Sequence, residues 1–356
     1  MQRFLRSILG SQQSGLVMVI LGLGAILAFF AGSHEDKATG AMVNNFLNAG
    51  TLLQVATDAS FFAIMAVGMT LIIVSDGIDL SIGSIYALAG VTMAMVLAAL
   101  PPSVSPVMTV FIGLGISLGI GLLCGLFNGA MIVGLNVHPF IITLGTMWVF
   151  RGIAFVASKA NSILVPQPLT DVAKCTLGLG KALYPVPLLT MLLITLLGAI
   201  YLSKTVMGRH IYAVGGNEDA SRFCGLRVKR IRIGVFVLAG LTAGIAAFLG
   251  ISYYGSASCG DAQGYELYVI ASAVVGGASM SGGKGSAISA MLGAILITMI
   301  RQSIRTLHFD QNYEWIIIGC AIVIAVVLDQ FNARMMQRRL ANAAAQARVQ
   351  QMSSAK

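Results

Sequence analysis

Long apolar runs separated by short polar segments recur along the whole chain. A helix that crosses the hydrocarbon core of a bilayer needs roughly 17–25 mostly apolar residues, and several of these runs reach that length. Others (84–100, 187–202 and 266–280) are short or contain polar residues. The pattern predicts an all-α fold, a polytopic membrane helix bundle of about ten transmembrane helices. The runs lie near residues 15–31, 52–74, 84–100, 107–126, 138–157, 187–202, 233–255, 266–280, 288–304 and 313–331.

Charged residues are too few to cover a surface that faces water. They make up 10% of the 356 residues, whereas 57% of the residues are hydrophobic. Soluble domains use roughly 25% charged residues. We therefore predict one transmembrane domain in a lipid bilayer, 1–332, followed by a cytoplasmic C-terminal tail, 333–356, that is rich in Ala, Gln and Arg.

The net charge of +9 raises the question of nucleic-acid binding. The cations flank the apolar runs and form no single soluble basic face, so we expect no nucleic-acid partner. Two lie near the amino terminus, seven in 203–232, one at Lys284 and five in the tail, which is fifteen of the 22 Lys and Arg residues. Because Lys and Arg accumulate in cytoplasmic loops, both termini and the 203–232 loop are predicted to be cytoplasmic.

The sequence offers no site for catalysis or nucleotide binding. A P-loop needs G-x-x-x-x-G-K-[ST], but the nearest stretch, 277–285, has Ala278 in place of Gly and Gly285 in place of Ser or Thr. The five cysteines contain no C-x-x-C pair, so no metal site is expected. A disulfide between Cys175 and Cys259 stays open. If the protein moves something uphill, the energy comes from a partner or from an ion gradient.

Polar residues interrupt the apolar pattern between residues 75 and 83. Asp76 and Asp79 lie there, and a lone aspartate at mid-bilayer costs roughly 2.5–3.5 kcal/mol on insertion scales. One interpretation is a broken helix that lines a pathway. The other is a short hydrated loop in which Asp79 is the N-cap of the next helix, and the two are compatible. The candidate pathway residues here are Asp76, Gly77, Asp79, Ser81 and Gly83.

A second glycine-rich break, 275–286, has a similar character. Each break combines small residues with a tight turn, a weak internal symmetry typical of transporters built from repeats, and we add Gly276 and Gly277 to the candidate pathway. Glu266 opens the preceding span, where a carboxylate favours a helix N-terminus, with substrate contact as the alternative. Arg151 lies late in the fifth span and is predicted to extend outward to the interface, again with substrate contact as the alternative.

The 203–232 loop has an organised pattern of its own. Asn217 is a good N-cap for a short helix that contains Ala220 and ends near Gly225. A short helix on basic flanks is suited to docking in the groove of another protein. Alternatively, the cations only set the topology. The candidate docking residues are Gly208, Arg209, Gly215, Gly216, Asn217, Ala220 and Gly225.

These motifs resemble those of the ribose-type (carbohydrate uptake type-2) permeases of ATP-binding-cassette importers, which are related to branched-chain amino acid permeases. The resemblance extends from about Phe46 to Asp329. Asp76 departs from the family pattern, which has a small residue there, and Tyr268 stands where the family commonly has Asp. The matching motifs are 65–71 with 77–83, 140–144, 207–217 with Ala220 and 224–226, 264–267, 274–277 and 282–285.

The resemblance implies a division of labour among several proteins. This chain would be a permease of a bacterial inner membrane, a second permease subunit, identical or paralogous, would complete the passage, and a periplasmic binding protein would deliver a monosaccharide. A cytoplasmic ATPase would use ATP to drive alternating access through residues 208–225, so no cofactor would be bound directly.

Other functions remain open beside this one. They are import of another small polar solute (a nucleoside, a branched-chain amino acid or a furanose signal), ion-gradient-driven secondary transport with Asp76 and Asp79 as the coupling site, and a membrane scaffold without transport.

Overall fold

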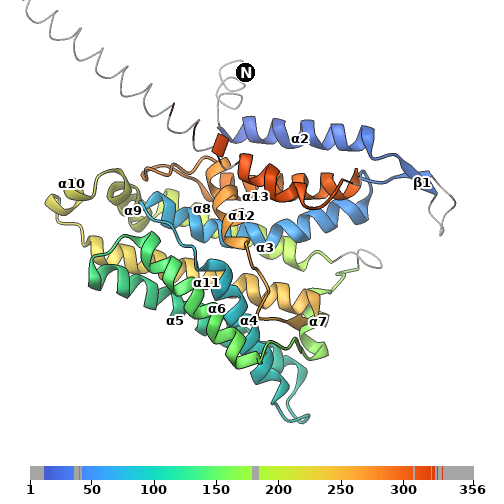
Figure 1. Ribbon diagram of the computed structural model, residues 1–356, viewed down its shortest axis with the longest axis horizontal. Helices are drawn as coiled ribbons and strands as arrows, with labels where there is room; N and C mark the ends of the chain where they lie inside the picture. The colour runs from blue at the N-terminus through green and yellow to red at the C-terminus, as the bar shows by residue number, and fades with distance from the viewer. Residues whose placement is uncertain are drawn as a thin grey trace, which may run out of the picture.

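The chain folds into a bundle of helices, shown in Figure 1. The computed structural model describes residues 12–35, 40, 42–178, 184–307, 309–321, 323, 324, 327 and 331. The helices are α2 (Gln12–Phe30), α3 (Ala49–Val74), α4 (Ile82–Ala98), α5 (Pro106–Leu135), α6 (Pro139–Ser158), α7 (Gln167–Ala173), α8 (Val186–Lys204), α9 (Val206–Gly216), α10 (Glu218–Phe223), α11 (Val228–Tyr254), α12 (Tyr265–Val275) and α13 (Ala287–Thr306).

Two short antiparallel strand pairs join the loops. Strands β1 (Ser33–Glu35) and β2 (Met42–Asn44) pair with Ser33 opposite Asn44. Strands β3 (Ile163–Leu164) and β4 (Ser256–Ala257) pair with Ile163 opposite Ala257, which ties the loop after α6 to the loop after α11.

The prediction of an all-α membrane bundle is confirmed, whereas the number of ten spans is not. Seven helices in the described part of the chain (α2, α3, α5, α6, α8, α11 and α13) are long and apolar enough to cross a membrane. Helix α4 is apolar but has 17 residues, and α12 has 11. An 11-residue helix is only about 16 Å long, so the predicted span 266–280 is a half-length helix. The predicted span 313–331 lies partly outside the described residues.

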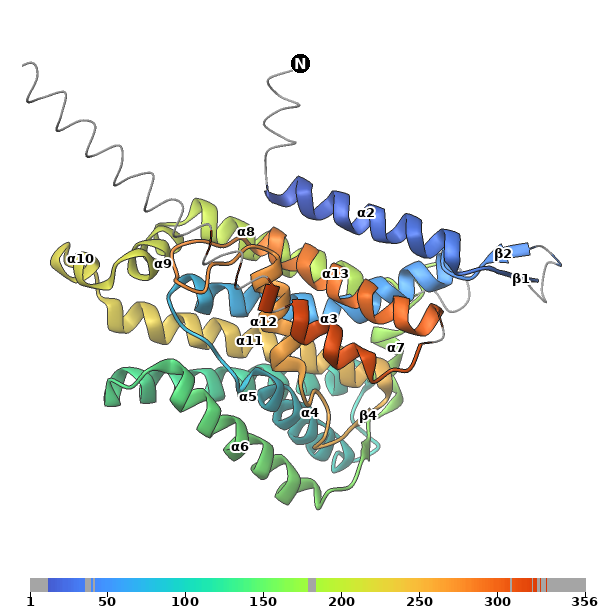
Figure 2. The ribbon, with the colours of Figure 1, turned by 45° about the horizontal axis from the view of Figure 1, so that its top comes forward.

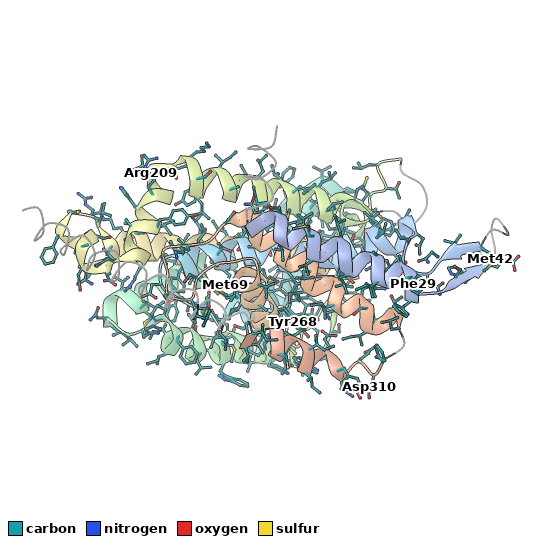
Figure 3. All side chains as sticks on the ribbon, turned by 90° about the horizontal axis from the view of Figure 1, so that it is seen from above. Phe29, Met42, Met69, Arg209, Tyr268 and Asp310 are labelled. Atoms are coloured by element: carbon teal, nitrogen blue, oxygen red, sulfur yellow. The ribbon has the colours of Figure 1, made fainter. Side chains whose placement is uncertain are left out.

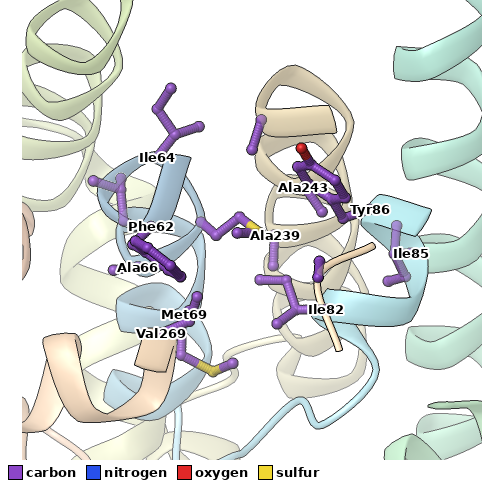
Figure 4. Close-up of a cluster of buried hydrophobic side chains, with 14 of the residues drawn as sticks. Phe62, Ile64, Ala66, Met69, Ile82, Ile85, Tyr86, Ala239, Ala243 and Val269 are labelled. Carbon is purple, nitrogen blue, oxygen red and sulfur yellow. The ribbon is translucent and has the colours of Figure 1, made fainter. Parts of the chain in front are cut away.

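Helix α3 is the centre of the core. Its 18-residue apolar window is 94% buried, and a helix that is apolar on all sides belongs in the interior of a bundle. It packs against α8, α11, α12 and α13. Figure 4 shows side chains of different helices meeting in this core, with Phe62 and Met69 on α3, Ala239 on α11, Ile82 on α4 and Val269 on α12.

Helices α5 and α11 lie with their backbones in close contact. A Cβ atom added to Gly240 would lie 2.1 Å from the carbonyl oxygen of Gly121, and one added to Gly121 would lie 2.3 Å from the carbonyl oxygen of Gly240. Only glycine fits at either position. Small residues of this kind are what membrane helices use to pack closely.

The two ends of the bundle differ in charge and in structure. Helices α9 and α10 lie at one end, and β1, β2 and α7 lie at the other, as Figures 1 and 2 show. Arg209 and Met42 are at these opposite ends in Figure 3. We call the first end the basic end, because its described cations are Lys204, Arg209, Arg222, Arg227, Lys229, Arg230, Arg232 and Lys284. We call the other the far end. The predicted tail, 333–356, lies outside the described residues.

The predicted 203–232 loop is mostly helical. Helix α8 continues to Lys204, α11 begins at Val228, and α9 and α10 fill most of the interval. The short helix after Asn217 was predicted and is α10, whereas α9 was not predicted. Thr205 caps α9 by accepting a hydrogen bond from the Gly208 N–H at 3.0 Å. Glycines lower helix propensity, and α9 contains Gly208, Gly215 and Gly216. The sequence alone therefore did not predict this helix.

Candidate functional site

A buried polar cluster precedes the first turn of α4. The side chains of Asp79, Ser81 and Asn128 are fully buried. Asp79 Oδ1 accepts hydrogen bonds from the Ser81 backbone N–H at 2.7 Å and from the Ser81 hydroxyl at 2.5 Å. Asn128 on α5 donates to the Ser81 hydroxyl oxygen at 2.7 Å. The cluster therefore joins the break between α3 and α4 to α5. Ser81 occupies the N-cap position of α4 but makes no side-chain cap bond. The predicted capping hydrogen bond is instead made by Asp79, two residues earlier in the chain, which accepts from the Ser81 N–H.

The two aspartates of this break have different surroundings. Asp76 is exposed and has a φ of 64°, the left-handed region that favours glycine and tolerates Asp. Asp79 is buried. The interpretation of the segment as a short hydrated loop is therefore wrong at Asp79 and holds only at Asp76. The left-handed backbone gives a physical reason for a small residue at position 76.

The loop before α12 packs on the first turn of α4. A Cβ atom added to Gly83 would lie 2.5 Å from the Ala262 carbonyl oxygen and 2.7 Å from Glu266 Oε2. Glycine at position 83 thus allows the start of α4 and the start of α12 to touch. Glu266 lies in the first turn of α12, as predicted. Three buried oxygens around this contact have no hydrogen-bond partner among the described residues: Asp79 Oδ2, Asn128 Oδ1 and Glu266 Oε2.

Arg151 holds the same loop from the opposite side. Its side chain is buried, and Nη1 donates to the carbonyl oxygens of Cys259 at 2.8 Å and of Asp261 at 2.5 Å. The prediction that Arg151 extends outward to the interface is therefore wrong, because the loop offers carbonyl acceptors inside the bundle. Burial raises the pKa of the Asp261 carboxyl, and the Ser258 backbone N–H and Arg151 partly offset that rise. Cys175 is exposed and Cys259 is buried, and both are free thiols, so the disulfide left open above is absent.

Gly276 and Gly277 end α12 and turn the chain toward α13. Gly277 has a φ of 96°, and a Cβ atom on Gly276 would lie 2.4 Å from the Ser289 carbonyl oxygen. These two candidate pathway residues therefore fix the turn and the packing of α12 on α13.

Helix α9 lies against both glycine-rich breaks at once. At the first break, a Cβ atom on Gly215 would lie 1.7 Å from the carbonyl oxygen of Val74, the last residue of α3. That same carbonyl accepts a hydrogen bond from the Gly283 N–H at 2.9 Å. At the second break, the Tyr212 hydroxyl donates to the Gly285 carbonyl oxygen at 2.6 Å. Helix α9 therefore connects the end of α3 with the 276–286 turn.

Helix α10 is capped as predicted and is held by ion pairs. The Asn217 side chain accepts a hydrogen bond from the Ala220 N–H at 2.8 Å, and the chain leaves the helix through Gly225, which has a φ of 81°. Glu218 forms ion pairs with Arg222 on α10 and with Arg232 on α11, each at 2.5 Å. The second ion pair links α10 to the first turn of the long helix α11.

Part of the 203–232 segment presents small and apolar groups to the outside. Gly216, Ala220 and Gly225 are exposed, and nothing lies within 4 Å of a Cβ atom added to Gly216 or Gly225. Phe223 is 92% exposed at the end of α10. A cavity of about 300 Å³ lies beside this helix, lined by Asp76, His138, Glu218, Arg222 and Arg232 among others. These residues are therefore accessible at the surface of the described part of the chain.

The predicted residues thus separate into groups. Asp79, Ser81, Gly83 and Glu266 meet around the first turn of α4, whereas Asp76 faces the cavity at the basic end. Gly208 lies inside the α8–α9 junction, where a Cβ atom would be 2.2 Å from the Leu202 carbonyl oxygen, and Arg209 is exposed.

Two residues that make these contacts were not predicted from the sequence as site residues. Asn128 lies in an apolar helix, and an amide there was the signal that a partner exists. Tyr212 had no such signal, because a tyrosine in a basic segment has many possible partners.

Comparison with known proteins places this arrangement in a family. Residues 51–326 match the model of the family described as branched-chain amino acid transport system / permease component. The chain is 36% identical to the ribose import permease protein of Bacillus subtilis (strain 168) over 287 residues, which cover 80% of this chain and 86% of the relative. It is 34% identical to the D-allose transport system permease protein of Escherichia coli (strain K12) over 287 residues, 80% of this chain and 85% of the relative.

A third relative, the fructose import permease protein of Rhizobium meliloti, is 30% identical over 292 residues, 80% of this chain and 79% of the relative. The matched region 51–326 begins in α3 and includes both breaks, α9 and α10. The resemblance drawn from the motifs is therefore confirmed, and this chain belongs to the family of branched-chain amino acid transport system permease components.

Proposed function

We propose that this chain is the transmembrane permease subunit of an ATP-binding-cassette importer for a monosaccharide, with alternating access driven by a separate ATPase. The observation that carries the proposal is the packing of α9 on both breaks, through Gly215 on Val74 and through Tyr212 on Gly285. The relatives named for ribose, allose and fructose support a monosaccharide as the solute.

The ATPase docks on the exposed part of the 203–232 segment. Gly216, Ala220 and Phe223 offer a surface of small and apolar groups next to the cavity at the basic end. An aromatic side chain that projects from a short helix is a suitable anchor for a partner's pocket. The remaining predicted docking residues, Gly208, Arg209, Gly215, Asn217 and Gly225, hold or flank α9 and α10.

Closure of the ATPase pair then moves α9 and α10 as one body. Because α9 contacts the end of α3 and the 276–286 turn, this motion reaches α3, α12 and α13 through contiguous contacts. Rigid-body rocking of helices around the two breaks alternates the access of the passage. The buried acceptors of Asp79, Asn128 and Glu266 then lie where a hydroxylated solute supplies the missing hydrogen bonds.

The proposal assigns partners and a place in the cell. A second permease subunit completes the passage, a periplasmic sugar-binding protein delivers the solute, and the ATPase binds ATP, so that this chain needs no cofactor of its own. The protein spans the bacterial inner membrane with both termini and the basic end in the cytoplasm. The pathway residues are Asp76, Gly77, Asp79, Ser81, Gly83, Glu266, Gly276 and Gly277.

Uptake in cells tests this proposal against ion-gradient-driven transport. Cells that express the permease with its ATPase and binding protein take up radiolabelled D-ribose, D-allose or D-fructose. Deletion of the ATPase gene is expected to abolish uptake, whereas collapse of the proton or sodium gradient at constant ATP is expected to leave it unchanged. Uptake that survives the deletion and disappears with the gradient would contradict the proposal.

A further inference from the structure

A patch of polar and aromatic side chains lies near the far end of the bundle. We call it the Gln54 patch, and it consists of Gln54 and Asp58 on α3, Tyr253 and Tyr254 on α11, and Arg305 on α13. Helices α11 and α13 both pack on α3, so the patch is built by three helices that are distant in sequence.

Hydrogen bonds and an ion pair connect the members of this patch. Gln54 Nε2 donates to Asp58 Oδ1 at 2.9 Å, and the Tyr253 hydroxyl donates to Gln54 Oε1 at 3.1 Å. Arg305 Nη1 lies 3.7 Å from Asp58 Oδ2. The rings of Tyr253 and Tyr254 lie 6.0 and 5.9 Å from the ring of Phe61. The polar groups are therefore held in place beside the faces of aromatic rings.

Contact with lipid is unfavourable for the exposed polar groups of the patch. Asp58 is nine residues into α3, which is about 13 Å along the helix from its start. Gln54 and Tyr254 are exposed, and the Arg305 side chain is 41% exposed. Asp58 itself is buried, and a carboxylate or guanidinium within the apolar part of a bilayer persists where it meets water or a partner. Arg305 is close to the end of α13, yet its guanidinium lies toward Asp58 and not away from the bundle.

The opposite side of the same stretch of α3 is apolar. Leu52 and Val55 line a cavity of about 390 Å³ together with Ile20 of α2, Leu188 of α8 and Ile295 of α13, among others. The first half of α3 therefore has one side that packs on apolar helices and one side that carries an amide, a carboxylate and hydroxyls. The polar side is therefore the part of α3 that is suited to contact with a polar solute.

An aromatic series leads from the patch toward the first turn of α12. Phe62 lies one helical turn beyond Asp58, with its ring 4.5 Å from the ring of Tyr265. The Tyr265 ring lies 6.1 Å from that of Tyr86 on α4. Tyr265 precedes Glu266, whose buried oxygen lies beside Gly83. The patch and the contact between α4 and α12 thus belong to one continuous region.

We propose that the Gln54 patch is the outer solute-contacting wall of the passage and that it binds a monosaccharide. An amide, a carboxylate, a guanidinium and two phenols supply both donors and acceptors for sugar hydroxyls, and the exposed ring of Tyr254 is available for the apolar C–H face of a sugar ring. The ring of Tyr253 is already covered by Lys174, whose Nζ lies 5.5 Å from its centroid. This inference rests on the proposed function. It adds the position at which the permease first binds the solute.

Transport by reconstituted complexes of permease, ATPase and binding protein tests the assignment. Gln54→Leu removes the amide and nearly keeps its size, Tyr254→Leu removes an exposed ring, and Tyr253→Phe keeps the packing on Phe61 and removes only the hydroxyl. Leu52→Ala on the apolar side of α3 is the matched control. Entry of radiolabelled D-ribose, D-allose and D-fructose into proteoliposomes is measured beside ATP hydrolysis stimulated by the sugar-loaded binding protein.

Each patch variant is expected to lower sugar entry about fivefold, the effect of losing one typical hydrogen bond, and to change the ranking of the three sugars. ATP hydrolysis and the binding-protein concentration for half-maximal stimulation are expected to stay as in the unaltered complex. Unchanged entry in Tyr253→Phe and in a folded Gln54→Leu would overturn the inference. An equal fall of entry and hydrolysis with weaker binding-protein stimulation would also overturn it, because the patch would then be a protein-docking surface. Lack of ATP-dependent entry in the unaltered complex would instead contradict the proposed function.

Discussion

Arg151 is a buried cation whose partners are backbone carbonyl groups. It donates to the Cys259 and Asp261 carbonyl oxygens in the loop between β4 and α12. Since that loop packs on Gly83, Arg151 indirectly fixes the contact between α4 and α12. A charged donor in this position stabilises a segment that has little regular structure of its own.

Arg151→Met is expected to destabilise the purified protein by about 2–3 kcal/mol, because two buried carbonyls lose a charged donor. Thermal unfolding in detergent measures the loss. Arg151→Lys keeps the charge and a donor and is expected to lose less. Equal stability of Arg151→Met and the unaltered protein would show that the loop does not depend on these bonds.

Substitutions at Asp79 and at Asp76 are expected to differ in their effect on stability. Asp79→Ala leaves the Ser81 N–H and hydroxyl without their buried acceptor and is expected to cost about 2 kcal/mol of stability and to lower transport. Asp76→Gly relaxes a left-handed backbone at an exposed position and is expected to change stability by no more than about 0.5 kcal/mol. If Asp79→Ala left both expression and flux unchanged, Asp79 would be neither a structural nor a pathway residue.

At the scale of the elements, α9 is the connection between the surface of the basic end and the interior. Its outer neighbour α10 carries the exposed Phe223, and its inner side touches Val74 and Gly285. Adjacent glycines on α9 have opposite surroundings, since Gly215 is buried against Val74 whereas Gly216 faces open space. A side chain added at Gly215 is therefore expected to disturb folding, whereas one added at Gly216 is expected to disturb only docking.

Gly216→Trp and Ala220→Trp are expected to abolish ATP-dependent uptake while the permease still inserts and folds, because the added rings occupy the docking surface. Gly215→Ala is the matched folding control, and it is expected to lower the yield of folded protein because its Cβ atom has no room beside Val74. Uptake and yield are measured in the same membranes. Normal uptake in Gly216→Trp and Ala220→Trp would remove the docking assignment.

The sequence predicted elements well where local chemistry determines them and poorly where tertiary contacts do. The position of α10 was predicted from Asn217, whose side chain caps the helix. The spanning helices were predicted from the lengths of the apolar runs. Helix α9 was missed because its stability comes from packing of Gly208 and Gly215, which weaken a helix in isolation. The inward direction of Arg151 was also missed, since its acceptors come from a loop that is distant in sequence.

At the scale of the whole molecule, two breaks from different halves of the chain converge. The first break joins α5 through Asn128, the loop before α12 joins α4 at Gly83, and α9 contacts the ends of both breaks. The two glycine-rich breaks seen in the sequence are thus in direct contact, since the Gly283 N–H donates to the Val74 carbonyl oxygen. We propose that this connected interior is a passage whose opening is powered by a separate ATPase.

Solute entry into sealed proteoliposomes that contain the purified permease tests that claim most directly. With the binding protein and radiolabelled sugar on one side and the ATPase with ATP on the other, entry is expected. Omission of the ATPase, or replacement of ATP by ADP, is expected to reduce entry to the level of protein-free vesicles. Entry at the full rate without the ATPase or without ATP would contradict the account.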